Sequence, residues 1–229
     1  MLLAVDSSTR YAGVAVCEEG RVLSSRSWYS AVNHTSQLMP AVAQILRQHG
    51  LAAGDLKGIA VALGPGGFSA LRVGMSVAKG LAVTTGKPVV GLGTLDLEAY
   101  PYVQSGLPVC AILDAGRSEV ASALFGPDGL RTREDMVGPA QELVDSIDEP
   151  TLFCGEAVSN WGGLIREHLG SLAVVAGPAP AQRIWALCQL GWKRLVEGQV
   201  ADLATLQPTY LRMPSIGGPK RRDWIPQRS

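Results

Sequence analysis

The sequence lacks the features that mark several large classes of protein. Its 20 basic residues balance 20 acidic ones, whereas a protein that binds nucleic acid by itself usually carries a basic excess. No uncharged apolar stretch is long enough to cross a bilayer, and the first apolar run stops at Asp6, too early for a signal peptide. We therefore expect a cytoplasmic protein with no membrane contact and no strong nucleic-acid binding of its own.

Motifs for metals and nucleophiles are missing as well. The four cysteines are widely separated and form no Cys-x-x-Cys pair, which predicts buried thiols in a reducing compartment. The three histidines form neither His-x-x-x-His nor His-Glu-x-x-His, and there is no Gly-x-Ser-x-Gly sequence. We therefore expect no metal ion and no catalytic residue, which makes a metallopeptidase a remote interpretation.

Two parts of the chain open with the same pattern, in which a short apolar strand ends at an aspartate, turns, and continues as a second strand. Asp6 ends the first such strand and Asp114 ends its counterpart. A pattern used twice indicates two similar halves, which we place at residues 1–104 and 105–229; chance similarity of two hairpins is the alternative. The basic tail at 220–228 is either a solvated terminus or a contact to RNA or a partner.

Strands alternate with helical patterns in both halves. The first half has a helix pattern that begins near residue 34 and another at 69–85, and the second has helix patterns at 142–147, 159–168 and 181–197. This alternation predicts an α/β fold, with mixed sheets because the hairpins add antiparallel pairs.

The residues around the two aspartates have the chemistry of a phosphate-facing or metal-facing turn. A carboxylate suits a hydrated cation, and hydroxyls and backbone amides suit phosphoryl oxygens. The alternative is that these side chains only satisfy amides of the turns. The predicted vestigial phosphate-facing residues are Asp6, Ser7, Ser8, Asp114 and Gly116.

A glycine-rich segment at 64–68 lies between a predicted strand and a predicted helix. Its spacing matches neither Gly-x-x-x-x-Gly-Lys-[Ser/Thr] nor Gly-x-Gly-x-x-Gly with a ribose-binding acid, so neither standard nucleotide motif applies. The helix that follows has a small residue at every fourth position, at Ala70, Gly74, Ala78 and Ala82. Such a face lets another helix come close, and that helix belongs either to the same domain or to another subunit.

Five segments resemble, in order, the TsaB family, also called YeaZ. They are residues 3–9, 34–40, 64–74, 112–120 and 208–212. The glycine-rich segment is the specific one, since the family usually reads Gly-Pro-Gly-Ser-Phe-Thr-Gly-[Leu/Val]-Arg. This chain has Gly67, Ser69 and Ala70 in place of Ser, Thr and Gly, and Gly116 where Arg is common.

The resemblance implies an actin-like ATPase (ASKHA) fold with two similar halves, each a mixed sheet flanked by helices. It also implies a noncatalytic subunit that binds and activates a TsaD-like enzyme in threonylcarbamoyladenosine (t6A) modification of tRNA, with tRNA bound only within the complex. A TsaE-like ATPase is a further expected partner and a homodimer a further expected state. No cofactor is expected to be required, and nothing in the sequence supports a protease.

The resemblance places the partner-binding surface on the two helices that begin near His34 and Ser69. The predicted interface residues are His34, Leu38, Val42, Ala70, Leu71, Gly74, Ala78 and Ala82. The alternative function is an active Mg-nucleotide phosphotransferase of the same fold. That reaction needs both aspartates to face the Mg-nucleotide and a substrate-side base, and the sequence offers no candidate for the base.

Overall fold

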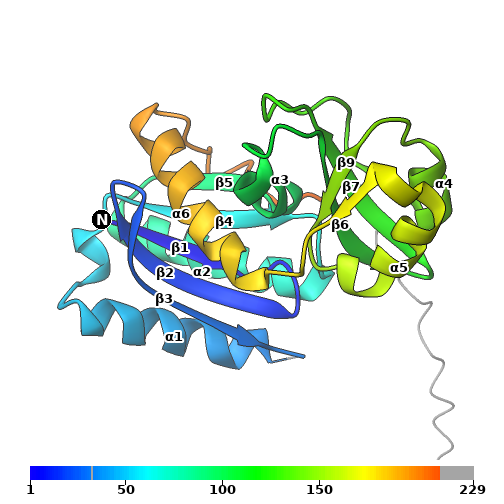
Figure 1. Cartoon of the computed structure of the whole chain (residues 1–229). Helices are drawn as coiled ribbons and strands as arrows, with labels where there is room; N and C mark the ends of the chain where they lie inside the picture. Colours follow the sequence, from blue (N-terminus) through cyan, green and yellow to red (C-terminus); the bar gives the residue numbers. More distant parts are fainter. Residues whose placement is uncertain (32, 212–229) are drawn as a thin grey trace, which may run out of the picture.

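The computed structural model describes residues 1–31 and 33–211, and these form two sheets of five strands each (Figure 1). The first sheet contains β1 (Leu2–Asp6), β2 (Tyr11–Glu18), β3 (Arg21–Tyr29), β4 (Gly58–Gly64) and β5 (Val89–Gly93). The second contains β6 (Val109–Gly116), β7 (Glu119–Phe125), β8 (Met136–Pro139), β9 (Thr151–Cys154) and β10 (Ala173–Val175). The basic tail lies outside the described residues.

The two sheets have equivalent topology. Their strand orders are β3-β2-β1-β4-β5 and β10-β9-β6-β7-β8. In each sheet an antiparallel hairpin, β1–β2 or β6–β7, is joined by a parallel strand, β4 or β9. The prediction of two similar halves with mixed sheets is therefore confirmed, and chance similarity of the two hairpins is excluded.

Among the described residues, six α-helices cover the sheets. They are α1 (His34–Gln48), α2 (Phe68–Thr85), α3 (Thr94–Ala99), α4 (Ala140–Asp145), α5 (Val158–Leu169) and α6 (Pro180–Val196), and short 3-10 turns occur at Ala53–Asp55, Tyr100–Tyr102 and Gly170–Leu172. Within the described part of the chain, no helix combines the length and the apolar character that a membrane span requires.

Alternate residues of β1 face opposite sides of the first sheet, as strand geometry requires. Leu3 and Val5 pack with the buried side of α1, whereas Leu2 and Ala4 pack with α6. Figure 1 shows α1 and α6 on opposite sides of this sheet. Both faces are therefore covered, which is typical of sheets with parallel strands.

The helix α6 belongs to the second half in sequence but packs on the first sheet, against β1, β2, β4 and β5. Its contact with the sheet is close, since a Cβ atom at Gly191 would lie 2.6 Å from the Cβ atom of Ala60. The predicted boundary after residue 104 stays a prediction. The position of α6 means that residues 105–229 do not all pack on the second sheet.

The four cysteines are all free and buried, which confirms the prediction of buried thiols. Burial raises the pKa of Cys110 to about 12. A thiol with such a pKa is almost wholly protonated at neutral pH and is therefore a poor nucleophile.

Candidate functional site

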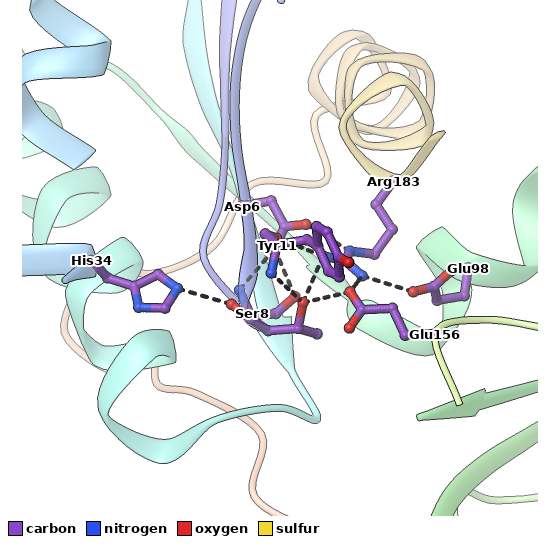
Figure 2. A network of polar contacts seen from close by, with 8 residues as sticks. Asp6, Ser8, Tyr11, His34, Glu98, Glu156 and Arg183 are labelled. Carbon is purple, nitrogen blue, oxygen red and sulfur yellow. Dashed lines mark hydrogen bonds and ion pairs between the residues drawn. The ribbon is translucent and has the colours of Figure 1, made fainter. Parts of the chain in front are cut away.

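A buried arginine lies at the centre of the region where the two halves meet (Figure 2). Arg183, near the start of α6, is 1% exposed. Its Nε donates to Asp6 Oδ2 over 2.8 Å. Its Nη1 donates to Glu98 Oε1 over 2.8 Å and also pairs with Glu156 Oε1. Because these carboxylates come from β1, α3 and the turn before α5, the network joins elements of both halves.

The rest of the guanidinium group is engaged as well. Nη2 of Arg183 donates to Thr9 Oγ1 over 2.9 Å and to the carbonyl oxygen of Tyr11 over 2.7 Å. Thr9 Oγ1 in turn donates to Glu156 Oε1 over 2.5 Å. Every N–H group of this guanidinium therefore has an acceptor, and none is left for a ligand.

Burial and charge act in opposite directions on the ionisable groups of this network. Burial raises the pKa of Glu98 above its ordinary value, although the charge of Arg183 works against this rise. Burial alone would lower the pKa of Arg183, but Asp6, Glu98 and Glu156 together raise it well above its ordinary value. The guanidinium therefore stays charged, and it faces more carboxylates than it can neutralise.

Asp6 and Ser8 use their polar groups within the chain. Asp6 Oδ1 accepts hydrogen bonds from the backbone N–H of Ser8 over 2.8 Å and from Ser8 Oγ over 2.6 Å, and Oδ2 accepts from Arg183. Both residues are at most 2% exposed. The acceptor atoms of Asp6 are therefore already occupied and water has little access to either side chain, while the phosphate-facing role of both residues stays a prediction.

Ser7, the third predicted residue of this turn, contacts α2. Ser7 Oγ donates to the carbonyl oxygen of Ala70 over 2.7 Å and accepts from the N–H of Gly74 over 3.0 Å. A Cβ atom at position 74 would lie 2.4 Å from Ser7 Oγ. Ser7 therefore holds α2 against the hairpin, and its phosphate-facing role stays a prediction.

The glycine-rich segment has a related role. The N–H of Gly67 donates to the carbonyl oxygen of Ser8 over 2.8 Å, and a Cβ atom at Gly66 would lie 2.0 Å from the same oxygen. Glycine at position 66 therefore permits the close approach of the segment to the hairpin turn.

The small-residue face of α2 packs on its own sheet. Ala78 and Ala82 are at most 1% exposed and cluster with Ile59, Val61 and Val89 of β4 and β5. The sequence left open whether this face contacts a helix of the same domain or one of another subunit. The structure shows that it contacts strands of the same chain.

Most of the predicted interface residues are therefore part of the chain's own core, and their role in partner binding stays a prediction. The buried ones on α1 and α2 are Leu38, Val42, Leu71, Gly74, Ala78 and Ala82. His34 is also buried, with Nε2 2.9 Å from the carbonyl oxygen of Thr9, and Ala70 is half-buried. The apolar spacing that suggested an interface is the spacing of the buried side of each helix.

A cleft of about 1270 Å³ lies beside this network and is lined by residues of both halves. Asp114 and Gly116 lie on its wall, where Asp114 Oδ1 accepts from the N–H of Gly116 over 2.9 Å and Oδ2 accepts from Asn160 Nδ2 over 3.1 Å. Asp114 is exposed. These two predicted residues do reach the cleft, and their role there stays a prediction.

Arg183, Glu98 and Glu156 were not predicted from the sequence. One signal for Arg183 was present, since it falls four and eight residues before Leu187 and Gly191 on the apolar face of its helix. A charged residue on a buried helix face requires a partner. No comparable signal points to the two glutamates. In the part of the chain that the structure describes, no group of three or more His, Cys, Asp or Glu side chains is arranged to hold a metal ion.

The TsaB protein of Bacillus subtilis, a "tRNA threonylcarbamoyladenosine biosynthesis protein", is 31% identical over 224 residues, which cover 93% of this chain and 94% of the relative. The chain belongs to the TsaB family. The Escherichia coli TsaB is 28% identical over 225 residues, with 92% and 94% covered.

Two further comparisons agree with this assignment. A family model described as "TsaD: tRNA N6-adenosine threonylcarbamoyltransferase" matches residues 29–150. The solved structure of YeaZ from Pseudomonas aeruginosa superposes with a TM-score of 0.74 at 27% identity, covering 92% of this chain and 99% of that one. The predicted family and the actin-like ATPase fold are thereby confirmed.

Proposed function

We propose that the chain is a noncatalytic subunit that binds a TsaD-type enzyme and activates it in t6A modification of tRNA. Its TsaB relatives, which align along almost their whole length, are named for t6A biosynthesis. The match to the TsaD family model supports a common origin with the enzyme. Two related chains that pair through similar faces are a common outcome of such ancestry.

The observation that carries the noncatalytic part of this proposal is the network around Arg183. Asp6 is the residue of the first half that a phosphotransferase would need for a hydrated cation, and both of its oxygens are occupied. A bound guanidinium with every N–H engaged cannot be displaced without leaving buried carboxylates unpaired. We therefore propose that the chain requires no cofactor and does not use Mg-nucleotide.

The partner surface in this proposal is the outer side of α1 and α2, not their buried side. The two helices lie side by side. On α2, Val73 and Val77 are half-buried, and Met39 of α1 is 43% exposed. A strip of partly exposed apolar side chains is typical of a protein-binding surface. Helices of a TsaD-type subunit are its proposed occupant, and a second copy of this chain is proposed to occupy it when that subunit is missing.

The experiment that tests this proposal is reconstitution with a TsaD-type enzyme. The subunits are first co-purified. The formation of t6A on tRNA is then measured with and without this chain, and a TsaE-like ATPase is added as the remaining proposed component. We propose that all of these components work in the cytoplasm. We expect a stable complex and t6A formation that depends on the chain. Equal t6A formation without the chain would contradict the activator role.

A matched pair of variants tests the surface. Met39→Glu puts a charge on the proposed partner side of α1, where the wild-type side chain is 43% exposed, whereas Val196→Glu puts one on an exposed position of α6. We expect Met39→Glu to lose the complex while its circular dichroism and melting temperature stay close to those of the wild type, and Val196→Glu to keep it. Retention of the complex by both folded variants would place the interface elsewhere.

A further inference from the structure

Aromatic rings gather at the rim of the cleft. Tyr11 and Tyr29 pair across β2 and β3 with ring centroids 5.3 Å apart, and they are 39% and 55% exposed. Phe68 and Tyr210 form a second pair, at 4.9 Å. All four residues line the cleft. Tyr11 and Tyr29 are the exposed pair, and such rings offer flat apolar surfaces on which the bases of a nucleic acid can stack.

Arginines stand beside these rings. Arg10 lies in the β1–β2 loop and Arg117 in the equivalent β6–β7 loop, and both are exposed and line the cleft. Neither forms an ion pair with any residue in the ranges 1–31 and 33–211. A third arginine, Arg72, lies 3.9 Å from the ring centroid of Phe68 and donates to the hydroxyl group of Tyr210 over 3.1 Å. The rim thus combines aromatic surface with positive charge from both halves.

The floor of the cleft has the opposite charge. Glu156 lines it, and the network behind it sets three carboxylates against the single guanidinium of Arg183. Asp114 adds an exposed carboxylate on the wall. A polyphosphate that entered deeply would meet these carboxylates, and like charges in a partly buried site repel strongly. Phosphate groups are therefore favoured at the rim and disfavoured at the floor.

We propose that the rim of this cleft binds unpaired nucleotides of an RNA strand that crosses the mouth. The bases stack on Tyr11 and Tyr29, which are the exposed rings of the rim, and the phosphates lie near Arg10 and Arg117. The negative charge at the floor disfavours the alternative ligand, a free nucleotide whose phosphates lie deep in the cleft. That the RNA is a tRNA loop rests on the function proposed above, while the site itself rests on the rim residues.

The rim also adjoins the proposed partner surface. Thr35 of α1 and Val73 of α2 line the cleft and belong to the helices on which the TsaD-type subunit is proposed to dock. An RNA strand on the rim would therefore lie close to that subunit.

The test measures binding of a fluorescently labelled, unpaired eight-nucleotide RNA by anisotropy, with the full chain alone and with its complex. Tyr29→Ala removes the most exposed rim ring, and Trp185→Ala removes an exposed ring on α6 that does not line the cleft. We expect Tyr29→Ala to weaken binding at least about fivefold and Trp185→Ala to leave it unchanged. Equal affinity of wild type and Tyr29→Ala would overturn the proposal.

The arginines are tested by salt dependence. The double variant Arg10→Ala/Arg117→Ala is expected to lower the slope of log K against log salt by about 1.4, since each lost phosphate contact on a single strand removes about 0.7. Arg21→Ala, at an exposed position at the far end of β3, is the control and is expected to keep the wild-type slope. An unchanged slope in the double variant would contradict the assignment.

A measurement without variants keeps the proposal falsifiable if a variant misfolds. RNA that carries 4-thiouridine is cross-linked to the wild-type complex, and the attached peptides are mapped by mass spectrometry. We expect peptides that contain Tyr11, Tyr29 or Phe68. Cross-links confined to other faces, preferential binding of duplex RNA, or competition by free ATP as strong as that by unlabelled RNA would each overturn the proposal.

The two proposals fail in distinguishable ways. Complex formation with the TsaD-type subunit is followed by size-exclusion chromatography in the same samples. If the complex forms and the rim variants bind RNA like the wild type, the RNA site is wrong and the partner role stands. If no complex forms but the full chain loses RNA binding on rim substitution, the RNA site stands and the partner role is wrong.

Discussion

The two hairpin turns of this molecule start from the same sequence pattern and end in different chemistry. In the first half, Asp6 is 2% exposed and is held by Arg183 and Ser8. In the second half, Asp114 is exposed and accepts hydrogen bonds from the N–H of Gly116 and the amide of Asn160. The difference arises because α6 crosses to the first sheet and brings a cation to one turn. A duplicated backbone therefore does not imply a duplicated site.

The largest effect that tests this comparison is expected from Arg183→Met. It leaves buried carboxylates unpaired, which destabilises a protein by about 3–5 kcal/mol. Arg117→Met, in the loop of the second hairpin, is expected to change the free energy of unfolding by less than about 0.5 kcal/mol. Urea unfolding of both variants checks this. A loss below about 1 kcal/mol for Arg183→Met would show that the network does not hold the two halves together.

The next effect compares the aspartates themselves. Asp6→Asn weakens charge-assisted hydrogen bonds to Arg183 and Ser8 and is expected to destabilise the chain by about 1.5–3 kcal/mol. Asp114→Asn alters an exposed turn and is expected to have an effect within about 0.5 kcal/mol. The two variants are compared by thermal and urea unfolding. Similar losses would mean that the two turns are energetically equivalent after all.

Glycines on one helix of each half give a third comparison. Gly74→Ala on α2 forces Ser7 to move, because the new Cβ atom would lie 2.4 Å from its hydroxyl oxygen, and is expected to destabilise the chain by about 1–3 kcal/mol. At Gly163 on α5 a Cβ atom meets nothing within 4 Å, so Gly163→Ala is expected to stabilise it by up to about 1 kcal/mol. Urea unfolding is predicted to show changes in the free energy of unfolding of opposite sign for the two variants. Changes of the same sign would contradict the prediction.

The smallest effect concerns pH. Glu98 has a pKa raised by burial above its ordinary value of 4.5. A carboxyl group with a raised folded-state pKa contributes stability below its unfolded pKa, and this is lost as the pH rises through the folded value. The amide side chain in the Glu98→Gln variant does not ionise, so its contribution to stability does not change with pH. The wild type is therefore expected to lose stability relative to this variant above pH 4.5. Unfolding midpoints from pH 4 to pH 8 check this, and a constant difference would contradict the raised pKa.

Much of the fold could be predicted because short-range sequence patterns determine its strands, turns and helices. The hairpins, the glycine-rich turn and the helix α2 follow from periodicity over short stretches. The packing of α6 on the first sheet could not be predicted, because no local pattern tells a helix which sheet it covers.

The site was less predictable for the same reason. Asp6 and Arg183 are 177 residues apart in sequence, so the sequence alone could not show that the aspartate is occupied. The packing partner of the small-residue face with Gly74, Ala78 and Ala82 could not be predicted, because such a face fits close approach to a strand as well as to a helix. In the structure this face packs against the hydroxyl of Ser7 and the apolar side chains of β4 and β5. These contacts join residues that are far apart in sequence, so no local pattern reveals them.

The central claim is that Arg183 occupies the carboxylate of Asp6 in the first hairpin turn. We therefore propose that a nucleotide-bound cation cannot bind there, and that the chain serves as a partner and not as a phosphotransferase. Calorimetric titration of the isolated chain with Mg-ATP, followed by an assay of phosphate release, tests this most directly. We predict neither tight binding nor release of phosphate. Tight binding with turnover would contradict the account.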